Sequence, residues 1–488
     1  MNQSPSNLDT FILIFKYVVL LLVVSCSVLA FMVAQNEKEF LIAILGVFCL
    51  VIVSFPMLIG SKVELFEPLT FLIVLVIIGI PIKIIYVLWI RRTDQFVIDH
   101  VLLNQQPDVF LPGTIVLVIT LFLLMMGYSL RFPTAPLSFL YFPQVKEFNG
   151  RKLQVALFVF VIIAVSGFLA FVGSAGVSLS SLTSLSQKRF LDFRAEGGER
   201  MHNILYVFVR MAGFSKFVVY FGLIWIIHRK KSFFSYTGLF IAVAIFQTII
   251  LAFMLNSRAG VALLLLDCCI LSYFLVNRVN PKMIIAVAMF GSFLMMVMLA
   301  ARLQMAKGTE GAPLGSLVQT TLCGRNFMDV AKICHIINGV PKAMDYRNGE
   351  MLYNWIAGPI PMKYWPEKPK WATQGIVVNQ KIFKYRGTVS GCPPGIMGEL
   401  YWNFGLAGLL IGMFLAGIIY KQMFVVFSYN RDSPAAILIY TMVFTRFFLF
   451  TIANDLGTGI VKAGLDLIPT YITLSYIGMT HSPVQDNE

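Results

Sequence analysis

The sequence has few charged residues for its length. Asp, Glu, Lys and Arg make up 13% of the 488 residues, whereas about a quarter of a soluble domain is charged. Hydrophobic residues account for 58%. So little charge excludes a chain that exposes most of its surface to water. The composition indicates a polytopic membrane protein, with residues 1–488 forming one domain embedded in the bilayer.

Cysteine is scarce and lacks the spacing of metal or redox sites. The seven cysteines include no paired Cys-X-X-Cys motif, which argues against the common zinc and thiol–disulfide sites. Four of them lie in apolar runs, where a thiol acts as a small packing group. The other three fall in one long segment and can form a disulfide if that segment faces an oxidising compartment. They are Cys323, Cys334 and Cys392.

Motifs of soluble enzymes are also missing. The sequence contains no glycine-rich nucleotide loop, no zinc-protease motif and no nucleophile elbow. No internal repeat indicates a duplicated transporter. We therefore expect neither a metal ion nor another cofactor.

About twelve apolar runs are long enough to cross a bilayer as helices. Between the ninth and tenth runs, residues 302–396 form the only long stretch of mixed polarity. The sequence therefore predicts an all-α polytopic membrane protein with about twelve transmembrane helices and one large loop. The predicted helices lie at 11–33, 40–60, 69–90, 112–130, 153–176, 203–227, 233–255, 260–277, 281–301, 397–420, 434–452 and 458–478.

The distribution of positive charge predicts the orientation of these helices. The basic cluster 228–231 (His-Arg-Lys-Lys) directly follows the sixth apolar run. Such clusters remain on the cytoplasmic side of a membrane. We therefore expect both termini in the cytoplasm and the 302–396 loop on the outer side.

The predicted outer loops nevertheless keep many cations, and the whole chain carries a net charge of +14. Nucleic acid is not the expected partner, because these charges are scattered among the membrane helices. Lipid headgroups account for some of them, and Arg194 can pair with Glu196 or Glu199, whereas Arg258 has no acid near it in sequence. Arginine also suits phosphate oxygens, since its planar fork donates several hydrogen bonds. The candidate anion ligands are Arg189, Arg194, Arg258, Arg302, Arg325 and Lys368.

One helix is predicted inside the large loop. Ser316 is a suitable cap for a helix over about 317–338, which Gly339 and Pro341 would end. Its apolar and polar residues separate onto two faces, so we expect it on the membrane surface or on the mouth of the helix bundle. His335 falls on the polar face and is a candidate general base, although a lone His on a helix is more often a surface residue.

Glu399 stands where the chain re-enters the membrane after the loop. A carboxylate there can act as a general base on a sugar hydroxyl, hold an arginine in place, or reflect the preference of helix starts for acids. Trp365 and Tyr401 are typical both of membrane interfaces and of surfaces that stack on sugars. The candidate catalytic residues are Glu399 and His335, and the candidate sugar-binding residues are Trp365 and Tyr401.

Four segments together resemble the Wzy-type polymerases that join oligosaccharide repeat units of bacterial O-antigen and capsule. The resemblance reaches over roughly the C-terminal two-thirds of the chain. It departs at Met362-Lys363, where the family motif often has Pro-Arg, so that the charge is kept but the planar fork is lost. The segments are 186–189 (Ser-Gln-Lys-Arg), 256–260 (Asn-Ser-Arg-Ala-Gly), 360–369 (Ile-Pro-Met-Lys-Tyr-Trp-Pro-Glu-Lys-Pro) and 394–405 (Pro-Gly-Ile-Met-Gly-Glu-Leu-Tyr-Trp-Asn-Phe-Gly).

The resemblance implies a GT-C-like membrane glycosyltransferase that works without a metal ion. It would transfer a growing glycan from undecaprenyl pyrophosphate to the non-reducing end of a lipid-linked repeat unit, on the periplasmic face of the bacterial inner membrane. Arginines would stabilise the charge on the leaving pyrophosphate. Besides this substrate and membrane lipids, a chain-length regulator and a flippase are implied partners. The alternatives are an O-antigen ligase and a flippase or transporter of lipid-linked glycans.

Overall fold

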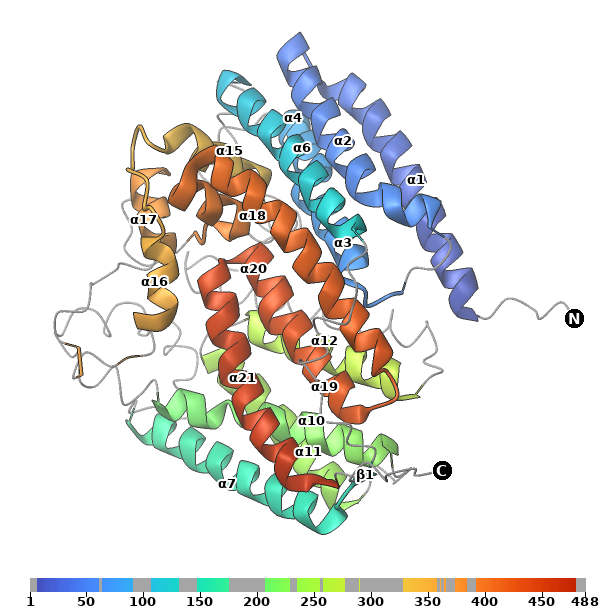
Figure 1. Cartoon of the computed structure of the whole chain (residues 1–488), viewed down its shortest axis with the longest axis vertical. Helices are drawn as coiled ribbons and strands as arrows, with labels where there is room; N and C mark the ends of the chain where they lie inside the picture. Colours follow the sequence, from blue (N-terminus) through green and yellow to red (C-terminus); the bar gives the residue numbers. More distant parts are fainter. Residues whose placement is uncertain are drawn as a thin grey trace, which may run out of the picture. The chain divides into compact units, whose positions relative to one another are not determined.

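The computed structural model describes residues 7–60, 64–90, 107–130, 147–174, 207–228, 235–254, 258–276, 289, 328–357, 360, 364–365, 374–383 and 392–479. Within these ranges the chain is helical apart from turns and one pair of two-residue strands. The strands β1 (Glu147–Phe148) and β2 (Gly478–Met479) pair antiparallel (Figure 1). Nine helices in the described ranges are long and apolar enough to cross a membrane. The chain is therefore an all-α, multi-pass membrane protein.

Nine of the predicted apolar runs coincide with these nine helices. Two further runs are helical but fall outside that set, since Tyr236–Ala252 is shorter and α21 (Leu456–Ile477) is not among the nine. The run at 281–301 lies outside the described residues, apart from residue 289. The number twelve, the single domain and the placement of the 302–396 loop stay predictions.

The chain divides into two compact units. The first comprises Met1–Pro136, Val318–Val426 and Arg446–Gly464, and the second comprises Leu137–Leu317, Phe427–Thr445 and Leu465–Glu488. Among the described elements, three contain a boundary between the units, namely the long helices α18 (Gly395–Tyr429) and α21 and the short π-helix η4 (Val443–Phe448). The candidate site described below lies within the first unit.

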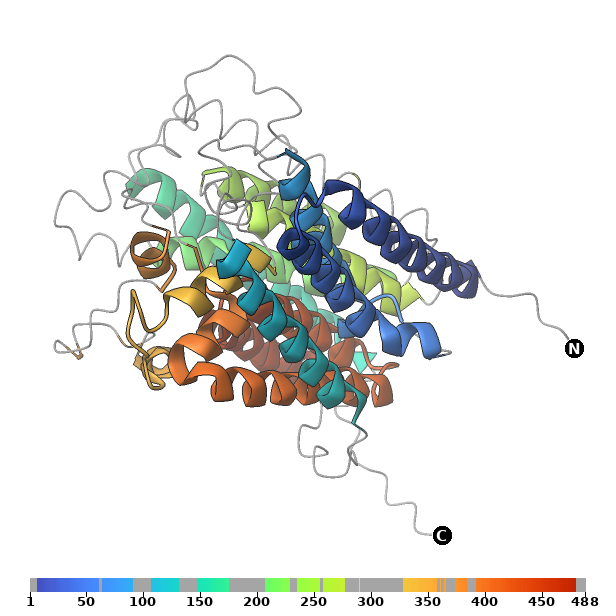
Figure 2. The same cartoon turned by 90° about the horizontal axis from the view of Figure 1, so that it is seen from above.

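In the first unit, the N-terminal helices form a layered group in which α1, α2 and α6 lie side by side (Figures 1 and 2). Gly127 of α6 and Gly417 of α18 allow these two helices to approach closely. A Cβ atom at Gly417 would lie 2.1 Å from the carbonyl oxygen of Leu124, which is the small-residue packing typical of membrane helices. The helices are α1 (Asn7–Val33), α2 (Glu37–Ile59), α3 (Pro68–Gly79), α4 (Pro81–Ile90), α6 (Pro107–Ser129), α15 (Val330–Gly339), α16 (Glu350–Ala357), α17 (Gln374–Lys381) and α20 (Leu449–Ala453), with most of α18.

The second unit is built around α10. Its phenylalanines stack with Phe160 of α7, and Lys216 of α10 forms an ion pair with Asp466 of α21. Tyr220 donates a hydrogen bond to the buried Asp267. These polar contacts satisfy groups that would otherwise be costly inside a membrane. The helices are α7 (Gly150–Ser174), α10 (Ser215–His228), α11 (Tyr236–Met254), α12 (Arg258–Val276) and α19 (Pro434–Met442).

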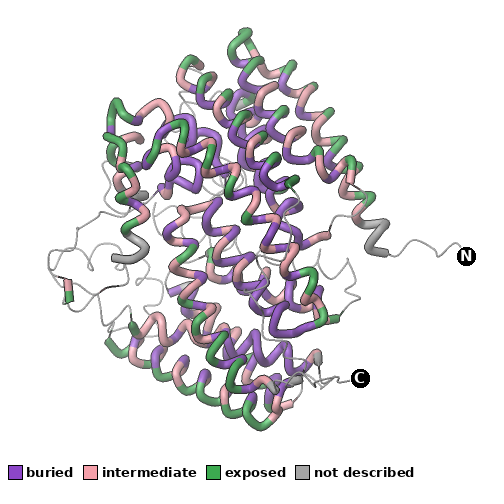
Figure 3. Tube along the Cα trace, in the orientation of Figure 1, coloured by how far each residue is buried: buried purple, intermediate pink, exposed green. Residues whose placement is uncertain are grey.

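Many large hydrophobic side chains are exposed on the surface of the helices. The outer face of α1 presents large hydrophobic side chains such as Tyr17, Leu21 and Phe31, and α7 presents others such as Leu169 (Figure 3). In a membrane protein such faces contact lipid tails. By contrast, residues 330–336 of α15 are all buried, which makes this short helix the starting point of the site.

Candidate functional site

Helix α15 is inserted between other helices of the first unit instead of lying on a surface. It begins at Val330, because the Asp329 side chain caps it by accepting a hydrogen bond from the Ala331 N–H at 3.0 Å. It packs so closely on α6 that a Cβ atom at Gly113 would lie 2.8 Å from the Cα atom of Cys334. The predicted start near Ser316 lies outside the described residues.

The polar face of this helix is buried. Lys332 is 1% exposed and His335 is 6% exposed. The apolar and the polar residues of α15 do lie on two different faces, as predicted, but both faces are covered by protein. Polar side chains can be buried here because each meets a specific partner, as the next contacts show.

A buried ion pair anchors the start of α15. The Lys83 ammonium lies 2.8 Å from an Asp329 carboxylate oxygen, and the two side chains are 2% and 0% exposed. Lys83 belongs to α4, which follows a break in the third span at Ile80 and Pro81. The carboxylate is also stabilised by the N-terminus of α15. The sequence showed Lys83 only as a charge within an apolar run.

His335 lies between two aromatic rings. Its ring centre is 5.4 Å from that of Phe110 and 5.1 Å from that of Phe383, both in edge-on geometry. The surroundings are therefore mainly those of a packing residue. The role of His335 as a general base stays a prediction.

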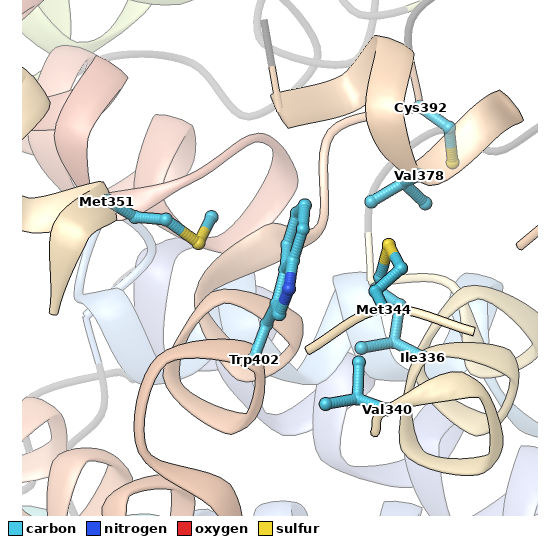
Figure 4. Close-up of a cluster of buried hydrophobic side chains, with 7 residues drawn as sticks. All are labelled: Ile336, Val340, Met344, Met351, Val378, Cys392 and Trp402. Atoms are coloured by element: carbon cyan, nitrogen blue, oxygen red, sulfur yellow. The ribbon is translucent and has the colours of Figure 1, made fainter. Parts of the chain in front are cut away.

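Buried apolar residues near α15 form a cluster around Trp402. Figure 4 shows Met351 on one side of its indole ring and Met344 and Val378 on the other. Cys392 is buried in the same cluster. The remaining members are Ile336 and Val340, with Val377, Ile382, Phe383 and Tyr401 packed against the cluster.

Cys334 takes no part in the disulfide expected among the three loop cysteines. Its thiol is free and faces α6, 3.8 Å from Thr114 Oγ1 and 3.7 Å from the Phe110 carbonyl oxygen. Burial raises its pKa to about 12. Cys323 lies outside the described residues.

Helix α18 consists of two helices with different directions. Gly405 has φ +64° and ψ −157°, which breaks the helix after Phe404. Gly395, with φ +71°, starts the first part and donates its N–H to the Asn454 carbonyl oxygen at 2.5 Å. Both values favour glycine, because other residues rarely adopt positive φ. Residues 395–404 therefore form a short half-helix, and this half-helix carries Glu399.

Glu399 is 1% exposed and lies at the N-terminus of another helix. Its Oε2 accepts a hydrogen bond from the Leu456 N–H, the first residue of α21, at 2.5 Å. Its Oε1 is buried and has no hydrogen-bond partner within the described part of the chain. The predicted preference of acids for helix starts is thus realised at α21, where the exposed peptide N–H groups stabilise negative charge.

A second acid faces the same helix end. Asp455 accepts hydrogen bonds from Thr458 N at 2.6 Å and from Thr458 Oγ1 at 2.9 Å. These are the contacts of an N-cap residue. Asp455 therefore caps the helix, and Glu399 adds a second carboxylate at the same helix end.

Lys332 joins these elements. Its ammonium donates to the Ala453 carbonyl oxygen at 3.3 Å, and a Cβ atom at Gly395 would lie 3.8 Å from it. Lys332 thus reaches both the turn before α21 and the first turn of the Glu399 half-helix. Lys332 was not among the predicted site residues, although its spacing of three residues from both Asp329 and His335 was a usable signal.

One of the predicted anion ligands, Arg258, lies within the described residues. Arg258 is the first residue of α12, but its side chain lies outside the described atoms. Trp365 is half-buried, and the Tyr401 hydroxyl donates to the Ile337 carbonyl oxygen at 3.4 Å. Across the described ranges, no three His, Cys, Asp or Glu residues lie close enough to hold a metal ion. The other predicted anion-binding residues lie outside the described residues, namely Arg189, Arg194, Arg302, Arg325 and Lys368.

A comparison with known families decides the relationship. The family model described as "Putative O-antigen polymerase" matches residues 213–452. Over this region the chain is similar to the O-antigen polymerase family. No curated protein and no solved structure matches it. The matched region includes Arg258, Lys332, His335 and Glu399, and the family resemblance expected from the sequence is confirmed over these residues.

Proposed function

We propose that the protein is a repeat-unit polymerase of O-antigen or capsule assembly. It transfers a growing glycan from undecaprenyl pyrophosphate to the non-reducing-end hydroxyl of a lipid-linked repeat unit, on the periplasmic face of the inner membrane. The family match supports the polymerase activity. The observation that carries the role of the site is the buried Glu399 carboxylate, of which one oxygen is held by Leu456 and the other has no partner in the described ranges.

The proposed reaction is one displacement at the anomeric carbon of the donor. The acceptor oxygen forms a bond to this carbon, and the bond from the carbon to the pyrophosphate oxygen breaks. The hydroxyl proton passes to Glu399 Oε1, and the bonding electron pair leaves with undecaprenyl pyrophosphate. A positioned base of this kind accelerates a reaction by about 10²–10⁴-fold. The new glycosidic bond uses the energy of the pyrophosphate linkage, so the reaction needs no further reactant.

The fixed orientation of Glu399 favours it as the base over His335. Oε2 accepts a hydrogen bond from the first residue of α21, so the carboxylate, and with it Oε1, keeps a single orientation. His335, by contrast, packs edge-on against the rings of Phe110 and Phe383. Arg258, Arg302 and the other arginines are proposed to bind the pyrophosphate and to stabilise the charge that develops on it.

A gene deletion separates this function from its alternatives. Loss of a polymerase leaves lipid A core that carries single repeat units, as seen on a surface-glycan gel. Loss of a ligase leaves bare core with lipid-linked polymer accumulating, and loss of a flippase leaves neither product. Either of the last two patterns would contradict the polymerase proposal.

Complementation of the deletion then tests the anion site. We expect Arg258→Ala to abolish chain extension while the protein is still inserted in the membrane. The matched control is Lys342→Ala, which removes an exposed loop cation that donates a hydrogen bond to Asn338. Chains of normal length with Arg258→Ala would contradict its role in binding pyrophosphate.

Purified enzyme should also remain active after treatment with EDTA, and loss of activity would contradict the metal-independent mechanism.

A further inference from the structure

A turn in the loop is attached to the C-terminal end of the Glu399 half-helix. The Arg347 N–H donates to the Trp402 carbonyl oxygen at 2.9 Å, and the Trp402 indole N–H donates to the Asp345 carbonyl oxygen at 3.0 Å. The Arg347 guanidinium also lies over the indole ring, 5.5 Å from its centre. We refer to residues 345–351 as the capping turn.

The reason for this attachment is the break at Gly405. In an unbroken helix each carbonyl oxygen accepts from the N–H four residues later, and a break disturbs this pattern for the last turn. The capping turn supplies a donor to this last turn from a distant part of the sequence. Tyr346 lies on the break itself, where a Cβ atom at Gly405 would be 3.5 Å from its ring.

Asn403 extends this attachment to the turn of helix that carries Glu399. Its Oδ1 accepts from the Met351 N–H at 3.3 Å, and its Nδ2 donates to the Glu399 carbonyl oxygen at 2.9 Å. The side chain is 1% exposed. One buried amide therefore bonds to the capping turn on one side and to the backbone of Glu399 on the other.

The capping turn itself reaches the surface. Tyr346 is 37% exposed, and Arg347 forms an exposed ion pair with Glu350. Asn348, at φ +46°, and Gly349, at φ +88°, give the turn a backbone that few sequences adopt. The turn is thus an exposed, well-defined structure with a short buried connection to the proposed base.

We infer that Asn403 is a positioning residue that transmits the position of the capping turn to Glu399. The bonded path runs from the Met351 amide, through the Asn403 side chain, to the Glu399 backbone, and from the Glu399 carboxylate to Leu456. A displacement of about 1 Å at a catalytic group can cost on the order of 100-fold in rate. The inference rests on the proposed function of Glu399, and the experiment below distinguishes the two.

The first measurement is hydrogen–deuterium exchange of the purified full-length protein, read by mass spectrometry. In Asn403→Ala we expect faster exchange in the peptide that contains Leu456, because its N–H is held by Glu399. Asn403→Asp should behave in the same way, since a carboxylate can accept from Met351 but cannot donate to the Glu399 carbonyl. Gly349→Ala disturbs the capping turn from the surface and should also increase exchange at Leu456, even if the Asn403 variants do not fold.

The matched control is Thr120→Val. Thr120 is a buried residue of α6 whose hydroxyl donates to the carbonyl oxygen of Val116, four residues earlier, just as the Asn403 side chain donates to Glu399, and this bond lies entirely within α6. We expect unchanged exchange at Leu456 in this control. Unchanged exchange at Leu456 in the Asn403 variants, or in Gly349→Ala where those do not fold, would overturn the inference, whatever the enzyme does.

The second measurement is the rate of polymerisation with purified lipid-linked repeat units. In Asn403→Ala we expect kcat to fall by about 10- to 100-fold with KM changed less than about threefold, because geometry is lost and substrate binding is kept. In a Glu399→Gln background, Asn403→Ala should lower the residual rate little further. If Asn403→Ala lowered the rate by the same factor with and without Glu399→Gln, positioning through Glu399 would be overturned. A Glu399→Gln enzyme with the normal rate would instead contradict the proposed function of Glu399 itself.

Discussion

The Glu399 carboxylate and the Leu456 amide are joined by a hydrogen bond of 2.5 Å, although 57 positions separate them in sequence. The bond links the half-helix that follows the large loop to the first residue of α21. Asp455 already provides the N-cap of α21 through its contacts with Thr458. One Glu399 oxygen is therefore held in place, while the other has no hydrogen-bond partner in the described part of the chain. The role proposed for this second oxygen is the basis of the first prediction.

Glu399→Gln should remove catalysis and preserve the fold. Glutamine keeps the shape, and its carbonyl oxygen can still accept from Leu456, but it cannot take a proton. We expect the rate of polymerisation in vitro to fall by about 10²–10⁴-fold, with the thermal unfolding temperature in detergent changed little. The exposed Glu37→Gln, at the start of α2, serves as the control. A Glu399→Gln enzyme within about twofold of the normal rate would rule out general-base catalysis by this residue.

The buried pair Lys83–Asp329 should contribute to stability only as a pair. Lys83→Met leaves an unpaired carboxylate in a site that excludes water, which costs about 3–5 kcal/mol. We expect a marked loss of folded protein in detergent for Lys83→Met, and a partial recovery in Lys83→Met/Asp329→Asn, because Asn carries no charge and still caps α15. Thermal unfolding in detergent is the measurement. A double variant as unstable as the sum of the two single variants would show that the pair is not coupled.

The positions of most helices could be predicted from the sequence because they follow from length and hydrophobicity alone. The insertion of α15 could not. Its two faces predicted a position on the membrane surface or on the mouth of the helix bundle. The partner that allows Lys332 to be buried is the backbone carbonyl of Ala453, which no sequence pattern reveals. In the same way, the pairing of Asp329 with Lys83 depends on how distant helices pack.

The candidate site shows the same limit. Glu399 was selected because it stands where the chain re-enters the membrane, and the structure places it at the N-terminus of α21. Its actual partner, Leu456, is an apolar residue that contributes only its backbone N–H. Asn403 was part of a recognised motif but received no role, since its two contacts exist only after Gly405 breaks the helix and the capping turn folds against it.

Cys334 should resist thiol reagents in the native protein. It lies outside the spanning helices, and burial raises its pKa to about 12, so at pH 8 about one thiol in ten thousand is ionised. Because the folded-state pKa lies above the unfolded value, the thiol's contribution to stability is complete below about pH 9 and is lost as the pH rises towards about 12. Maleimide labelling at pH 8, followed by mass spectrometry, should modify Cys334 only after denaturation in SDS. Equal labelling rates in the native and denatured protein would contradict this burial.

The break in α18 should require glycine at position 405. A Cβ atom at φ +64° costs roughly 1–2 kcal/mol, and relief of this strain by a straighter helix would displace Trp402 and Asn403 from the capping turn. We expect Gly405→Ala to lower both the unfolding temperature and the polymerisation rate, because the half-helix that carries Glu399 is held from both ends.

The control for this prediction is Gly464→Ala in α21, where a Cβ atom would meet nothing within 4 Å. Alanine in an ordinary helical position stabilises by about 0.5–1 kcal/mol relative to glycine, so this variant should unfold at the same or a higher temperature and keep its rate. If both variants behaved alike, the effect of Gly405→Ala would reflect general helix propensity. A loss confined to Gly405→Ala, together with faster exchange at Leu456, would show that the break fixes the position of Glu399.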